Sequence, residues 1–273
     1  MPHKIQYYSP NLRLSQIFSL FLISSPESEL VDYFRAITGK KFILLTNSCR
    51  TALYLAYKVS NVPGAVITTP LTCITSVQPI IESGRHVIFA DIEEHSLNLS
   101  ASQVEVLLSP EASIVQLVHH GGVPCEIDDF IDLKKKYDFL MVEDCAQAIG
   151  SKYNDKSVGY FGDVSCFSLI KNSYGVSGGV LATDDEGLYM RAKHLQETFP
   201  KQSLLLTVLR IFRGIFESYR GLNNFSDAIL KIIKKRNSAE TRRVDEFKKS
   251  MKKPDNLSLI VATAQLKMLP QLH

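Results

Sequence analysis

Short apolar runs rich in β-branched residues recur along the first two hundred residues, and amphipathic segments of helical period separate most of them. The runs span residues 42–45, 66–69, 87–90, 114–118, 139–142, 164–167 and 180–183. The helical patterns occupy residues 27–37, 51–59, 74–82, 101–108, 126–137 and 186–197. This alternation predicts an α/β fold, with a mostly parallel seven-stranded sheet and helices on both faces. The short, turn-rich link between the last two runs predicts a departure from that order.

The character of the chain changes after Phe199-Pro200, where strand signals disappear and helical patterns continue. These patterns are interrupted at residues 221–224 and 253–256. We therefore expect an α/β domain over residues 1–200 and a helical extension over residues 201–273.

The helical extension is basic, with 15 Lys and Arg against 6 Asp and Glu, whereas residues 1–200 carry 16 against 22. Solvated helix faces are the favoured explanation of this charge. The alternative is contact with an anionic surface, such as membrane headgroups or substrate phosphates. The apolar segment 204–216 is too short and too charged to span a bilayer. We favour its packing on a partner subunit over its lying along a membrane surface.

The five cysteines are widely spaced and include no Cys-x-x-Cys pair, which is typical of reduced thiols in an intracellular protein. The N-terminus lacks a signal-peptide pattern. We therefore expect a cytoplasmic protein. His119-His120 follow the fourth apolar run, but no third ligand stands at metal-binding spacing. A structural or substrate-contacting role is favoured over a metal site.

An acid and an amine follow two neighbouring predicted strands. Asp144 comes after the run 139–142, and Lys171 lies three residues beyond Ser168, which ends the run 164–167. Pyridoxal phosphate (PLP) chemistry requires such a pair, because the amine holds the aldehyde as a Schiff base and the buried acid keeps the pyridine nitrogen protonated. Both residue types are common at strand ends, so the pair alone is a weak signal.

Other features gather at the same edge, because ligands of open α/β sheets bind beyond the carboxyl ends of the strands. Residues 46–53 open a helix whose N-terminus would suit a cofactor phosphate, although a simple N-cap at Asn47 or Ser48 is the plainer interpretation. Cys73 follows the second run and would lie against a flat ring. Gln147 follows Asp144. Their convergence predicts one cofactor site.

Taken together, these residues resemble the DegT-type sugar aminotransferases, a branch of the PLP-dependent enzymes of fold type I. The resemblance runs from about residue 27 to residue 197. It rests on Pro70, Asp91-Ile92, Val118-His119-x-x-Gly122-x-Pro124, Glu143-Asp144-x-Ala146-Gln147-Ala148-x-Gly150, Gly159-x-x-Gly162-Asp163, Phe167-Ser168, Lys171-Asn172 and Gly178-Gly179. The order and spacing of these motifs are highly specific.

The resemblance implies a role for each candidate residue. Lys171 would form the Schiff base and carry protons, and Asp144 would pair with the pyridinium nitrogen. Gln147 would contact the ring hydroxyl. Ser168 and the backbone amides of Cys49 and Arg50 would hold the phosphate. Cys73 stands where many relatives place an aromatic ring against the cofactor.

The resemblance also implies the reaction: ping-pong transfer of an amino group, usually from glutamate, to the keto carbon of a nucleotide-linked sugar. A homodimer is implied, and no nucleic-acid partner is expected. Ser168 and Lys171 stand closer together than in most relatives, and the sequence stops at His273, where relatives continue into a smaller C-terminal domain. The alternative is therefore a truncated, catalytically silent relative that binds PLP or a partner subunit.

Overall fold

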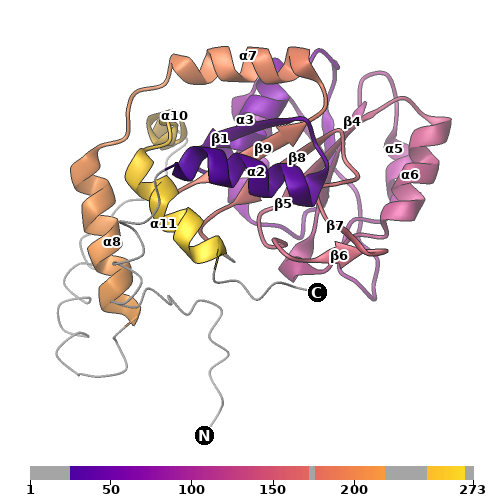
Figure 1. The fold of residues 1–273 in the computed structure, drawn as a ribbon. Coiled ribbons are helices and arrows are strands. Elements are labelled where there is room, and N and C mark those ends of the chain that lie inside the picture. The colour runs from indigo at the N-terminus through magenta and orange to yellow at the C-terminus, as the bar shows by residue number, and fades with distance from the viewer. Residues whose placement is uncertain (1–24, 172–175, 219–244, 268–273) are drawn as a thin grey trace, which may run out of the picture.

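The computed structural model describes residues 25–171, 176–218 and 245–267 (Figure 1). Its main sheet has seven strands in the order β1-β9-β8-β5-β4-β2-β3. The strands are β1 (Phe42–Thr46), β2 (Val66–Thr68), β3 (Val87–Phe89), β4 (Ile114–Val118), β5 (Leu140–Cys145), β8 (Val164–Ser168) and β9 (Gly179–Thr183). The predicted α/β fold is confirmed. The predicted break at residues 221–224 and the motif residue Asn172 lie outside the described residues.

Within the main sheet, as far as the structure describes it, β9 alone runs against its neighbours, since it pairs antiparallel with both β1 and β8 while the other pairs are parallel. The expected departure at the last two strands is thus confirmed. A strand can return antiparallel after a short link, whereas a parallel return needs a long crossover. The short connection between β8 and β9 therefore leaves β9 with the antiparallel direction.

Helices cover both faces of the sheet, as predicted (Figure 1). One face carries α3 (Cys49–Val59), α4 (Ile74–Glu82) and α7 (Glu186–Glu197), whose buried side chains share a core with the sheet. On the other face, α2 (Pro26–Thr38) covers the β1–β9–β8 side. On the same face, α5 (Ala101–Leu107) and α6 (Ile127–Lys136) pack over β2, β4 and β5.

Two local features differ from the prediction. Strand β5 extends to Cys145, three residues beyond the predicted end, because the polar Glu143 and Asp144 are both buried and hydrogen-bonded. A small hairpin of β6 (Lys152–Tyr153) and β7 (Lys156–Ser157) was not predicted. Its two turn residues have positive φ angles of 46° and 62°, a conformation that the Asn-Asp pair of residues 154 and 155 tolerates well.

The described residues after Pro200 are helical, in α8 (Leu204–Ser218), α10 (Asp245–Ser250) and α11 (Asn256–Leu266). The predicted interruption at residues 253–256 is confirmed, since α11 begins at Asn256. Helices α10 and α11 pack into the cores on opposite faces of the sheet. The division near residue 200 stays a prediction.

Helix α8 leaves large apolar side chains exposed on its surface. They are Leu204, Leu205, Leu206, Leu209 and Phe212. Packing of this segment on a partner subunit stays a prediction. Across the described parts of the chain, no helix combines the length and the apolar character needed to cross a bilayer.

Candidate active site

A cavity of about 190 Å³ opens where the carboxyl ends of β5 and β8 meet the N-termini of α3 and α4. All seven residues predicted for the site line this cavity: Cys49, Arg50, Cys73, Asp144, Gln147, Ser168 and Lys171. They come from four separate stretches of the chain, and the sheet topology brings them together. Their individual roles remain predictions.

Asp144 lies at the closed side of the cavity with a relative exposure of 4%. Its Oδ1 accepts the backbone N–H of Ala146 at 3.0 Å, and its Oδ2 accepts the hydroxyl of Ser76 at 2.5 Å. A carboxylate offers about four lone-pair sites. Its two other contacts, from Cys49 Sγ at 3.8 Å and Gln116 Nε2 at 3.4 Å, are long, so Asp144 can still accept a closer donor from a molecule in the cavity.

Cys49 is a weak hydrogen-bond donor to Asp144, and its sulfur is not suited to act as a nucleophile. Its Sγ lies 3.8 Å from Asp144 Oδ1. Burial, and next the negative charge of Asp144, raise the pKa of Cys49 well above its ordinary value. Because the thiolate is the reactive form of cysteine, this sulfur stays unreactive at neutral pH.

The N-terminus of α3 is built by local capping and by a distant helix. The side chain of Ser48 accepts the N–H of Thr51 at 3.2 Å, so the N-cap interpretation of this segment is correct. Asn47 donates to the carbonyl of Ser250 at 2.9 Å, and the Arg50 guanidinium lies 5.5 Å from the ring centroid of Phe247. Helix α10 thus holds in place a terminus whose partial positive charge attracts anions.

The other predicted site residues end neighbouring elements. The Oγ of Ser168, at the end of β8, accepts the N–H of Ile170 at 3.4 Å. Gln147 Oε1 accepts the N–H of Gly121 at 2.8 Å, so its amide nitrogen is the end that can donate to a ligand. Cys73 is exposed at the N-cap of α4.

A close backbone approach keeps the α3 terminus beside β9. A Cβ atom on Gly179 would lie 2.2 Å from the carbonyl carbon of Ser48 and 2.3 Å from the nitrogen of Cys49. We expect Gly179→Ala to destabilise the fold by about 3 kcal/mol, because backbone atoms must move to admit the methyl group. Urea unfolding would measure this loss. The control is Gly187→Ala, whose Cβ meets only side-chain atoms of Arg191 and Asp185. Equal midpoints for the two variants would contradict the prediction.

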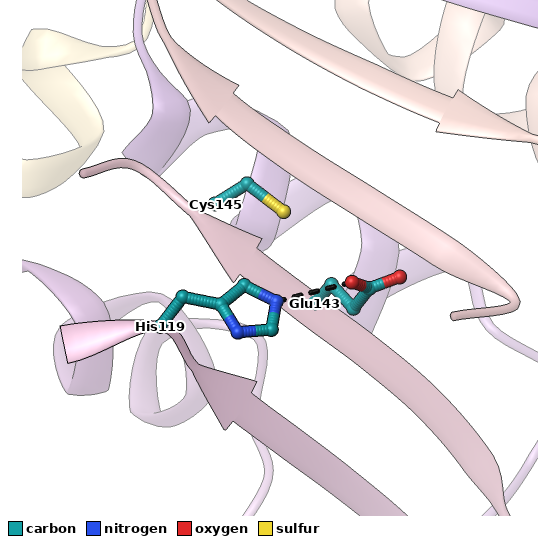
Figure 2. Close-up of side chains that lie close together, drawn as sticks. All are labelled: His119, Glu143 and Cys145. Atoms are coloured by element: carbon teal, nitrogen blue, oxygen red, sulfur yellow. Dashed lines mark hydrogen bonds and ion pairs between the residues drawn. The ribbon is translucent and has the colours of Figure 1, made fainter. Parts of the chain in front are cut away.

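A second buried carboxylate lies on the opposite face of the sheet, because adjacent strand residues point to opposite faces. Figure 2 shows Glu143 with His119 and Cys145. Glu143 accepts the Nε2–H of His119 at 3.0 Å, the N–H of Gly159 at 2.7 Å and the N–H of Gly162. Burial alone raises the pKa of Glu143, but these three donors lower it below its ordinary value on balance.

The hydrogen bonds of this cluster favour a structural role over a metal site. Its three ligand-type atoms lie within 4.8 Å of one another. However, Glu143 is engaged by three donors, and His119 Nδ1 accepts the N–H of Cys125 at 3.1 Å. Burial, and then the charge of Glu143, raise the pKa of Cys145 well above its ordinary value. His119 also lines the candidate active-site cavity, so its structural and its substrate-contacting role both stay predictions.

Sequence reasoning missed two polar residues that contact Asp144. Ser76 and Gln116 are both buried, and neither lies in a motif that suggests chemistry. The available signal was a lone glutamine in the otherwise apolar run 114–118.

Comparisons with known proteins agree with the resemblance found in the sequence. The DegT/DnrJ/EryC1/StrS aminotransferase family model matches residues 22–202. The chain is 37% identical over 159 residues to the spore coat polysaccharide biosynthesis protein SpsC of Bacillus subtilis, covering 57% of this chain and 41% of that protein. It is 37% identical over 133 residues to the GDP-perosamine synthase of Escherichia coli O157:H7, and this match covers 48% of this chain and 36% of that protein.

Solved structures show the same fold. PseC of Helicobacter pylori, an aminotransferase of pseudoaminic acid biosynthesis, superposes with a TM-score of 0.63 at 25% identity, over 72% of this chain and 57% of that one. AtS13 of Actinomadura melliaura superposes with a TM-score of 0.66 at 20% identity, and the match covers 93% of this chain and 64% of that one. The chain spans less than half the length of the curated relatives described above.

Proposed function

Because the chain belongs to the DegT/DnrJ/EryC1/StrS aminotransferase family, we propose that it is a PLP-dependent aminotransferase acting on a nucleotide-linked sugar. Glutamate or a similar amine would be the donor, and a keto carbon of the sugar the acceptor. The name of one relative, GDP-perosamine synthase, supports a nucleotide-linked substrate. That of SpsC supports a role in polysaccharide biosynthesis.

The observation that carries the proposal is a single cavity lined by a buried carboxylate, Asp144, and an amine, Lys171, beside a helix N-terminus. These groups match the chemical groups of PLP. An acceptor suits the ring nitrogen, an amine suits the aldehyde, and a helix N-terminus suits the phosphate. The chain's own residues therefore fit the cofactor.

When bound, PLP supplies an electron-withdrawing ring and an aldehyde that takes up the amino group. Lys171 would hold that aldehyde covalently and then move protons at the reacting carbon. Asp144 would keep the ring nitrogen charged, and Gln147 would orient the ring through its amide nitrogen. Ser168 and the first turn of α3 would bind the phosphate.

The proposal includes further parts. The chain would act as a cytoplasmic homodimer, with an α/β domain over residues 1–200 and a helical extension over residues 201–273. The exposed apolar side chains of α8 support a protein contact in the extension. Analytical ultracentrifugation would report the oligomeric state.

Borohydride reduction followed by peptide mapping tests the cofactor and its attachment together. We expect the protein incubated with PLP to turn yellow and, after reduction, to carry the pyridoxyl group on Lys171. Glutamate should bleach the colour of the unreduced protein. A catalytically silent family member would stay yellow when glutamate is added, and a protein that serves only as a scaffold would be colourless.

Replacement of the buried acid tests the assignment of the ring partner. We expect Asp144→Asn to lower turnover by roughly 10²–10³-fold, because a neutral amide cannot hold the ring nitrogen charged. The fold should survive with a modest loss of stability, since the amide oxygen can still accept from Ser76 while the NH2 group faces the N–H of Ala146. Steady-state kinetics and thermal unfolding would measure both effects. Asp132→Asn, at an exposed position of α6, is the matched control. Turnover at the wild-type rate in Asp144→Asn would refute the assignment.

A further inference from the structure

Gln116 is a polar residue at the centre of an apolar strand. It lies in β4 with a relative exposure of 0%. Burying a primary amide is unfavourable unless it is hydrogen-bonded. Its Nε2 donates to the Oγ of Ser76 at 2.5 Å and lies 3.4 Å from Asp144 Oδ2. The amide is therefore turned toward the candidate active site.

Ser76 connects this amide to the carboxylate. It lies in the first turn of α4, with a relative exposure of 6%, and lines the cavity. A hydroxyl has one proton to donate. Ser76 gives that proton to Asp144 Oδ2 at 2.5 Å and accepts one from Gln116. The three side chains thus form a directed hydrogen-bond chain from β4 through α4 to β5.

We propose that Ser76 and Gln116 are positioning residues that keep the Asp144 side chain aimed at the ring nitrogen of PLP. This inference rests on the proposed function. The chain fixes Oδ2, while the N–H of Ala146 fixes Oδ1 at 3.0 Å, so the carboxylate cannot rotate without losing a partner. Every one of these neighbours donates, which suits a group that only accepts. Hydrogen bonds in such a chain also polarise and strengthen one another.

The carbonyl oxygen of the Gln116 side chain argues for function over packing. Gln116 Oε1 is buried and has no hydrogen-bond partner among the described residues. An unpaired buried acceptor destabilises the fold. An apolar side chain of the same size would avoid this loss. The glutamine therefore does something that packing does not require, namely donation to Ser76.

Cofactor binding by the apoprotein is the first test. We expect Ser76→Ala and Gln116→Met each to weaken PLP binding about tenfold, measured by fluorescence titration, because a hydrogen bond that supports a charged group is lost. Ser76→Thr keeps the hydroxyl and should restore binding. Gln116→Met should unfold at a denaturant concentration no lower than wild type, since it removes the unpaired oxygen. Weaker binding without lower stability distinguishes positioning from a structural role.

Two variants serve as matched controls. Ser165→Ala removes a buried hydroxyl that donates to Gly159 O at 2.6 Å. Gln196→Met removes a buried amide that donates to Leu45 O at 2.9 Å. Neither contact involves Asp144. Both controls should bind PLP as wild type does.

The absorption of the bound cofactor provides a second readout. A ring that is held less firmly in its charged form withdraws electrons less strongly from the bond to Lys171. The nitrogen of that bond then keeps its proton up to a higher pH. We therefore expect the loss of the yellow band on alkalinisation to move to higher pH in Ser76→Ala and Gln116→Met, and to stay in place in both controls.

The outcomes separate the two proposals. If wild type binds PLP on Lys171 but Ser76→Ala and Gln116→Met match the controls in affinity and in pH profile, the positioning role is overturned and the aminotransferase proposal stands. If Ser76→Thr fails to restore binding, the hydroxyl is not the group responsible, which also overturns the inference. If wild type takes up no PLP, both proposals fail.

Discussion

Replacing Lys171 with alanine should reduce turnover by roughly 10²–10⁴-fold, the range expected for the loss of a positioned proton-transfer group. The protein should also lose the borohydride-trapped adduct. Lys171 lines the cavity and is only half-buried, so its truncation removes little core packing. Stability should therefore match wild type. Stopped-flow absorbance during the glutamate half-reaction would measure the loss.

Lys171→Arg is the matched variant for this experiment. It keeps the positive charge in the cavity, but a guanidinium does not form the covalent bond that the lysine amine forms. Both variants should be equally inactive. Activity in Lys171→Arg would show that charge alone suffices, and adduct formation in Lys171→Ala would place the attachment on another residue.

Replacing Glu143 with leucine should produce the largest loss of stability, about 3–5 kcal/mol. The change leaves three buried donors without an acceptor: the Nε2–H of His119 and the backbone N–H groups of Gly159 and Gly162. Urea unfolding would measure the loss. Glu105→Leu is the control, because that side chain pairs with Lys136 at the surface and should shift stability by less than about 0.5 kcal/mol. A similar small shift for Glu143→Leu would contradict the structural role.

The stability difference between wild type and Glu143→Leu should depend on pH in a defined direction. Because the folded state lowers the pKa of Glu143 below its ordinary value of 4.5, the carboxylate stabilises the fold above that pH. This contribution disappears as the pH falls through the lower folded-state pKa. The difference in unfolding free energy between wild type and Glu143→Leu should therefore shrink on acidification below pH 4.5.

The predictable parts of this protein are those governed by local pattern. The strands of the main sheet are apolar runs, buried except at the edge strand β3, and the sequence located them to within a few residues. The strand ends then indicated Asp144 and Lys171, because topology places the carboxyl ends of parallel strands at one edge. Recognition of spaced motifs added the remaining cavity residues.

The parts that were missed depend on partners far apart in the sequence. Ser76 and Asp144 are 68 positions apart, and Gln116 and Ser76 are 40 apart. Nothing near Ser76 in the sequence distinguishes its hydroxyl from an ordinary helix-start serine. The extension of β5 was missed for the same reason. Two consecutive acids look like the end of a strand until their hydrogen-bond partners are known.

The antiparallel placement of β9 has a consequence for biosynthesis. Strand β1 leaves the ribosome early, yet it is an edge strand whose sheet partner, β9, lies more than 130 positions later. Until β9 has been synthesised, β1 therefore has no strand to pair with. The parallel strands β2, β3, β4 and β5 can already assemble at that stage. Contacts between such distant segments form slowly, and an unpaired apolar strand invites aggregation in the meantime. Completion of the sheet must then wait until β9 has been synthesised.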